Sequence, residues 1–143
     1  MKILFLCVAN SARSQMAEGL AKKIFGEEAE ILSAGSKPSF VNPLAIKAME
    51  EVGIDISKQF SKSVAIINLT AIDYVITLCE DEVCPYVKGM VTREHWPLSD
   101  PAALHGTEIE KLQQFRKTRD LLETRITEFK RHIQPQFNCQ KLF

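Results

Sequence analysis

Residues 2–7 (KILFLC) form an almost wholly apolar run, and a polar loop follows it at once. A strand without alternation of polar and apolar side chains is typical of a parallel sheet that is buried on both faces. After the loop, apolar residues recur with helical spacing at positions 17, 20, 21, 24 and 25, and Gly26 provides a stop. A buried strand, a short loop and an amphipathic helix in this order predict an α/β fold.

The rest of the chain continues the alternation of strands and helices. We predict three more strands, at residues 30–34, 74–79 and 91–96, and two more helices, at 43–52 and roughly 106–133. This order indicates a four-stranded parallel sheet with helices on both faces. Because the sequence shows no repeat, linker or low-complexity tract, residues 1–143 are predicted to form a single domain.

Composition excludes several classes of protein. Eighteen basic side chains balance eighteen acidic ones, so the chain lacks the positive field that nucleic acids or membrane surfaces require. The apolar run at the N-terminus is too short to span a bilayer. Four cysteines at uneven spacing do not form a secreted disulfide framework. We therefore expect a cytoplasmic protein without a nucleic-acid or membrane partner. With three histidines and no Cys-x2-Cys pair, we expect no metal site, and we predict no cofactor.

The loop at residues 7–14 (CVANSARS) has the features of an oxyanion site. A short loop that leads into a helix directs unpaired backbone N–H groups at one point, and the helix dipole adds positive potential there. That potential favours an oxyanion and also the thiolate form of Cys7. Arg13 offers a planar pair of donors for two oxygens, and Asn10 tolerates a left-handed backbone. Ser14 and Ser11 are candidate donors to the sulfur. The predicted oxyanion-binding residues are Val8, Ala9, Asn10, Ser11, Ala12, Arg13 and Ser14.

A second cysteine, Cys79, ends the predicted strand at residues 74–79. Ligands of open parallel sheets lie beyond the carboxyl ends of the strands, and Cys7 ends a strand as well. Both sulfurs are therefore expected on the functional edge of one sheet.

Several segments of the chain, in order, resemble the low-molecular-weight tyrosine phosphatase fold, and more closely the thioredoxin-coupled arsenate reductases on that fold. The resemblance runs from residue 2 to about residue 130. The matching segments are NSARSQMAE at 10–18, SAG at 33–35, NP at 42–43, EVGIDIS at 51–57, VITLC at 75–79, EHW at 94–96 and DP at 100–101.

The resemblance implies a mechanism. Cys7 would attack arsenate while Asp100, in the Asp-Pro pair, protonates the leaving oxygen. Cys79 would then attack Cys7 and release arsenite. Cys84 would attack Cys79 in turn, and thioredoxin would reduce the resulting disulfide. Phosphate and sulfate would compete with arsenate for the loop.

Two alternatives remain open. The first is a phosphatase that acts on phosphotyrosine or small phosphate esters through Cys7, Arg13 and Asp100; a weak activity of this kind is expected even of a reductase. Against it, Ala12 stands where ordinary phosphatases of the fold have a second cysteine. Two alanines also follow Asp-Pro, where those phosphatases have tyrosines. The second alternative is a protein that senses anions or redox state through the same loop.

The chain also departs from the family pattern. Cys79 and Cys84 are closer together than the resolving cysteines usually are, and Ala9 replaces a common glycine. Some members bind potassium at a site that Asn10, Glu18 and Ser33 partly match, but Lys62 stands where an acidic ligand would be. We therefore predict no bound potassium, with the Lys62 ammonium in its place. Cys139 is expected to be incidental, and His95 and Trp96 to pack near the site.

Overall fold

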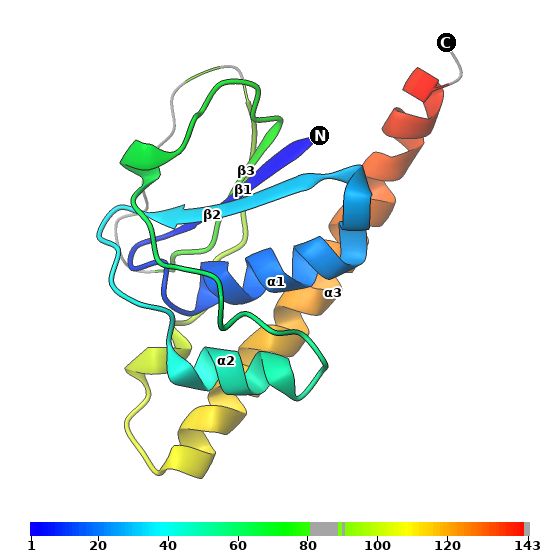
Figure 1. Ribbon diagram of the computed structural model, residues 1–143. Helices are drawn as coiled ribbons and strands as arrows, with labels where there is room; N and C mark the ends of the chain where they lie inside the picture. The colour runs from blue at the N-terminus through cyan, green and yellow to red at the C-terminus, as the bar shows by residue number, and fades with distance from the viewer. Residues whose placement is uncertain (81–88, 90, 142–143) are drawn as a thin grey trace.

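The computed structural model describes residues 1–80, 89 and 91–141, and side chains as far as residue 134. Its centre is a four-stranded sheet in which every strand pairs in parallel with its neighbours, in the order β2-β1-β3-β4 (Figure 1). The strands are β1 (Lys2–Cys7), β2 (Glu30–Gly35), β3 (Tyr74–Thr77) and β4 (Thr92–His95). The predicted four-stranded parallel sheet is confirmed, and only the ends of the strands differ from the expectation by one or two residues.

The α-helices are α1 (Arg13–Phe25), α2 (Pro43–Glu50) and α3 (Glu108–Lys141). Asn42 caps α2, since its side-chain oxygen accepts a hydrogen bond from the Leu44 N–H at 2.9 Å. Helix α3 runs on to Lys141 instead of ending near residue 133. Ile133, near the predicted end, is buried in the core.

The two faces of the sheet are covered unequally. The β1 side chains Ile3 and Phe5 pack on a large core built with all three α-helices, which lie together on one side of the sheet (Figure 1). Leu4 and Leu6 point to the other face and pack in a smaller cluster, whose described cover includes the short 3-10 helix η2 (Val64–Ile66). The three predicted helices thus lie on one face, and among the described residues the prediction of helices on both faces is met on the other face only by the short η2.

The carboxyl ends of β1 and β3 lie side by side, since Leu6 pairs with Thr77 and the Leu78 N–H donates to the Leu6 carbonyl at 2.9 Å. Cys7 is the last residue of β1, and Cys79 lies two residues after the end of β3, so both cysteines predicted at this edge of the sheet follow adjacent strands.

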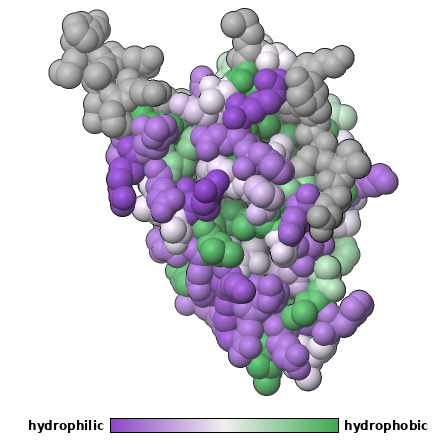
Figure 2. Space-filling view, turned by 180° about the vertical axis from the view of Figure 1, so that it is seen from behind, coloured by the Kyte–Doolittle hydropathy of each residue, from purple (hydrophilic) through white to green (hydrophobic). Residues whose placement is uncertain are grey.

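The surface seen from behind is largely hydrophilic, with small scattered apolar patches (Figure 2). In the part of the chain that the structure describes, no helix combines the length and apolar character needed to cross a bilayer.

Candidate active site

Cys7 is the last residue of β1, and its sulfur is buried. The Cys7 Sγ atom lies 2.8 Å from the hydroxyl oxygen of Ser14, in the first turn of α1. Cys7 is a free thiol. The strand end therefore presents one sulfur to the loop, with a hydroxyl in contact. The expected contact from Ser14 is confirmed, whereas no contact between the Ser11 hydroxyl and Cys7 occurs among the described residues.

The carbonyl groups and the N–H groups of the loop differ in their hydrogen bonding. The carbonyls of Val8, Ala9 and Ser11 accept hydrogen bonds from the backbone N–H groups of Lys37, Ser39 and Asn42 at 2.9–3.2 Å. The N–H groups of residues 9–12, in contrast, donate to no protein acceptor in the described part of the chain. A loop whose carbonyls are engaged and whose N–H groups are available has the polarity required to bind an oxyanion.

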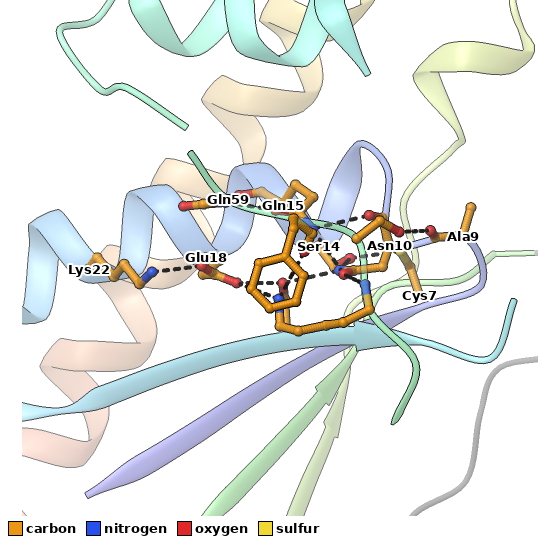
Figure 3. Close-up of polar contacts among 12 residues, drawn as sticks. Cys7, Ala9, Asn10, Ser14, Gln15, Glu18, Lys22 and Gln59 are labelled. Carbon is orange, nitrogen blue, oxygen red and sulfur yellow. Dashed lines mark hydrogen bonds and ion pairs between the residues drawn. The ribbon is translucent and has the colours of Figure 1, made fainter. Parts of the chain in front are cut away.

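Asn10 holds this conformation. Its backbone has φ 47°, the left-handed conformation anticipated for this residue type. The side-chain Nδ2 atom donates to the hydroxyl oxygens of Ser14 at 2.7 Å and Ser33 at 3.0 Å, and the Oδ1 atom accepts from the Lys62 N–H at 3.0 Å (Figure 3). Because Asn10 is fully buried, these bonds stabilise a conformation that is otherwise costly.

Two glutamines brace the loop from the side of α1. The buried Gln15 amide donates to both the carbonyl and the side-chain oxygen of Asn10, at 3.1 and 2.9 Å, and to the Phe60 carbonyl at 3.0 Å. Gln59 donates to the Gln15 carbonyl and side-chain oxygens at 3.0 and 2.8 Å (Figure 3). This pair ties the loop to the segment at residues 59–62, in which the sequence had connected Lys62, but not Gln59, with the site.

Gly35, at the end of β2, lies directly under the loop. A Cβ atom added there would stand 2.3 Å from the Val8 carbonyl oxygen and 2.9 Å from the Asn10 nitrogen. The backbone of the loop thus passes so close to residue 35 that any side chain at this position would collide with it. Only glycine permits this close approach.

Arg13 begins α1 and is buried. Its Nη1 atom donates to the Leu98 carbonyl at 2.9 Å and to the Leu78 carbonyl at 3.4 Å. The guanidinium therefore links the loop to two other segments of the sheet edge. It keeps a fixed orientation, which a pair of donors to one anion requires.

Of the two predicted resolving cysteines, the structure describes Cys79 but not Cys84. Cys79 is fully buried and follows Leu78, whose backbone contacts both β1 and Arg13. It is disulfide-bonded in the structure, and Cys7 is not its partner. Cys84 lies outside the described residues. Cys139 lies within α3, at a position for which side chains are not described.

Asp100 lies two residues after Leu98 and is exposed. Its carboxylate accepts a hydrogen bond from the Ala102 N–H at 2.9 Å and caps the 3-10 helix η3 (Pro101–Ala103). His95 is also exposed, with its Nδ1 atom 2.7 Å from the Thr77 hydroxyl. Trp96 packs in the core against Phe5 and Phe129, which agrees with a packing role.

Asn10, Glu18 and Ser33, which partly match the potassium site of some family members, do not form a potassium site in this chain. The Lys62 ammonium lies 3.5 Å from Glu18 Oε1 and 3.1 Å from the Phe60 carbonyl oxygen. The Asn10 side-chain oxygen already accepts hydrogen bonds from Gln15 and the Lys62 N–H. The place is therefore taken by a cation of the chain itself.

The chain is similar to several known proteins in sequence and in fold. The model of the low molecular weight phosphotyrosine protein phosphatase family matches residues 2–138. An arsenate reductase of Bacillus subtilis (strain 168) is 49% identical over 129 residues, which cover 89% of this chain and 93% of that protein. A solved structure of an arsenate reductase in the phosphate-binding state has a TM-score of 0.75 and 36% identity, covering 90% of this chain and 95% of that one.

A thioredoxin-dependent arsenate reductase of Corynebacterium glutamicum is 30% identical, with a TM-score of 0.72, and the match covers 94% of this chain and 62% of that one. The family match and the high identity cover most of the chain. The chain therefore belongs to the low molecular weight phosphotyrosine protein phosphatase family, among the arsenate reductases of that fold.

Proposed function

We propose that this protein is an arsenate reductase that uses Cys7 as nucleophile, recycles it through Cys79 and Cys84, and draws its electrons from thioredoxin in the cytoplasm. The observation that carries the proposal is that Cys7, at the end of β1, and Cys79, two residues beyond the end of β3, follow neighbouring and hydrogen-bonded positions of the chain. Leu78, which precedes Cys79, donates to the carbonyl of Leu6, which precedes Cys7. A hydrolase needs only the first of these sulfurs, whereas a reductase needs both.

The first step is the capture of arsenate. The N–H groups of residues 9–12 and the Arg13 guanidinium supply donors to the oxyanion, and the helix dipole of α1 adds to their potential. The Cys7 thiolate forms a bond to arsenic as an As–O bond breaks. Asp100 gives the departing oxygen a proton, and the oxygen leaves as water or hydroxide according to its own protonation.

The second step is the reduction itself. The Cys79 thiolate attacks the Cys7 sulfur and forms the Cys7–Cys79 disulfide. The electron pair of the S–As bond passes to arsenic, which leaves as arsenite, so two thiols are oxidised while arsenic gains two electrons. Cys84 then attacks Cys79 and releases Cys7 as a thiolate, and a thioredoxin dithiol reduces the Cys79–Cys84 bond. The disulfide-bonded state of Cys79 supports this scheme, since it requires a second sulfur within reach.

Three cysteine variants test the relay. Thioredoxin-dependent arsenite production should vanish in Cys7→Ser and in Cys79→Ser, and Cys84→Ser should release arsenite in a single turnover only. Cys139→Ser is the matched control and should keep full activity. Full multiple turnover by Cys79→Ser would refute the relay.

Hydrolysis of an aryl phosphate by the same variants separates the reductase from a phosphatase, since hydrolysis requires Cys7 but not Cys79. An efficiency on aryl phosphate that exceeds the efficiency on arsenate, and survives Cys79→Ser, would favour the phosphatase. Binding of phosphate without turnover of either substrate would favour a sensing protein.

A further inference from the structure

The Lys62 ammonium is held inside the molecule beside the loop. Its side chain is 10% exposed and forms an ion pair with the Glu18 carboxylate, which is 6% exposed. The ammonium also donates to the Phe60 carbonyl oxygen and lies 4.7 Å from the centroid of the Phe60 ring. A buried ammonium is stable only with such partners, and the buried carboxylate in turn needs positive charge.

A hydrogen-bond chain leads from this carboxylate to the nucleophile (Figure 3). The Ser33 hydroxyl donates to Glu18 Oε1 at 2.6 Å. The two N–H bonds of the Asn10 amide nitrogen point to the oxygens of Ser33 and Ser14.

The Ser14 hydroxyl oxygen thus accepts from Asn10, and its own proton is available for the neighbouring sulfur of Cys7 at 2.8 Å. An ionised Glu18 favours this set of directions because it accepts the proton of Ser33 and keeps Asn10 in the role of donor to both hydroxyls.

We propose that Lys62 is a positioning residue that supplies a covalently attached cation to this chain, and thereby makes the reactivity of Cys7 independent of free monovalent cations. The inference rests on the proposed function, because it takes Cys7 as the nucleophile. Lys62 pairs with the Glu18 carboxylate, Glu18 orients Ser33 and Asn10, and Ser14 directs its proton to the sulfur. The backbone N–H of Lys62 also holds Asn10, and that contact is kept in any side-chain variant.

Lys22 provides a matched control. Its ammonium contacts the other oxygen of the same carboxylate, Glu18 Oε2, at 2.7 Å, but its side chain is 52% exposed. Water and salt screen an exposed charge far more than a buried one. The two lysines therefore share a partner and differ in burial.

The test measures the rate at which iodoacetamide alkylates Cys7, as a function of pH, in NaCl and in KCl at equal ionic strength. Wild type should give the same profile in both salts. Lys62→Met should shift the profile to higher pH and slow alkylation at neutral pH by about three- to tenfold, the size of effect expected when one hydrogen bond of ordinary net strength is lost. Lys62→Arg should retain most of the wild-type rate, and Lys22→Met should change it little.

Lys62→Asp sharpens the test, because two carboxylates at this place create an oxygen-lined site for a cation. Its alkylation rate should rise when KCl replaces NaCl. A wild-type profile that depends on potassium would overturn the proposal, whether or not the variants fold. So would a folded Lys62→Met variant with the wild-type profile.

Alkylation of Cys7 does not require arsenate, Cys79 or thioredoxin, so the two proposals fail separately. An unreactive wild-type Cys7 would refute the proposed function. A reactive Cys7 that is insensitive to Lys62 would refute only the positioning role.

Discussion

The two sides of the predicted catalytic edge are built differently. On one side, the loop at residues 7–14 is mostly buried, and hydrogen bonds from Lys37, Ser39, Asn42, Gln15 and Lys62 hold its carbonyl and amide oxygens. On the other side, Asp100 is exposed, and its carboxylate has one contact among the described residues, the Ala102 N–H. The loop is therefore shaped before any anion arrives, whereas the carboxylate is fixed only by a local turn.

This contrast separates binding from proton transfer. An oxyanion gains most from donors that need no reorganisation, and we propose that the braced loop provides them. A proton donor must instead exchange its proton with water in each cycle, and an exposed carboxylate can do so directly. Changes on the loop side should therefore affect anion binding, and changes at Asp100 should affect turnover alone.

The largest effect is expected from Asp100→Asn. Asparagine caps a helical turn as well as aspartate does, so the fold is kept, but the proposed proton donor is lost. We expect kcat for arsenate reduction to fall by about 10²- to 10⁴-fold with little change in phosphate inhibition. Steady-state kinetics of thioredoxin-dependent turnover measures both.

Asp55→Asn is the matched control, since Asp55 is exposed and caps Ser57 in the same way, at 2.8 Å. Its activity should equal that of wild type. A large rise in the phosphate inhibition constant of Asp100→Asn would break the separation of the two sides.

Gly35→Ala should give the next largest effect. The added Cβ would collide with the Val8 carbonyl oxygen at 2.3 Å, and the backbone of the loop must shift to relieve the collision. Displacement of catalytic groups by about 1 Å costs roughly 100-fold in activity, and the crowding also costs about 1–3 kcal/mol of stability. Turnover and phosphate binding should fall together, as measured by kinetics and by titration.

Gly106→Ala controls for the substitution itself. The atom nearest to its added Cβ would be Oε2 of the flexible Glu110 side chain, at 3.0 Å. If Gly35→Ala retained phosphate binding at the wild-type level, the loop would not be as tightly shaped as its contacts indicate.

The smallest effect is expected far from the edge, at Glu51. A hydrogen bond from the Arg116 guanidinium, aided by Arg119, lowers the pKa of the Glu51 carboxyl from 4.5 to about 2. Because the pKa of Glu51 is lower in the folded state, the ionised carboxylate stabilises the fold above pH 4.5. This contribution to the free energy of unfolding is lost as the pH falls toward 2.

Glu51→Gln should therefore lower the unfolding temperature slightly at pH 7, and the difference from wild type should disappear between pH 4.5 and 2. Turnover at pH 7 should not change. Thermal unfolding followed by circular dichroism across this pH range is the measurement. A reduction in kcat would show that the edge is sensitive to the remote packing of α2 on α3.

Local patterns predicted the fold because each strand and helix has its own signal. The unbroken apolar run of β1 indicated a central strand, and the sequence Asn42-Pro43 marked the start of α2. The loop was predictable for the same reason, as strand, loop and helix are contiguous. Even the left-handed backbone of Asn10 followed from its residue type.

The braces around the loop were not predictable, because they depend on contacts between distant segments. Gln59 meets Gln15 across 44 positions of sequence, and Leu98 meets Arg13 across 85. A glutamine or a backbone carbonyl carries no local signal of such a partner. Gly35 belongs to a segment that matches the family, but the reason for a glycine there appears only when the loop passes over it.

One contact of Arg13 has a mechanical consequence for the chain as a whole. The same nitrogen that belongs to the anion-binding guanidinium is hydrogen-bonded to the residue directly before Cys79. A movement of the backbone at Leu78 would therefore displace the Arg13 guanidinium, and a reorientation of the guanidinium would break its hydrogen bond to Leu78. In the proposed mechanism, anion binding in the loop and movement of Cys79 would therefore be coupled through Arg13.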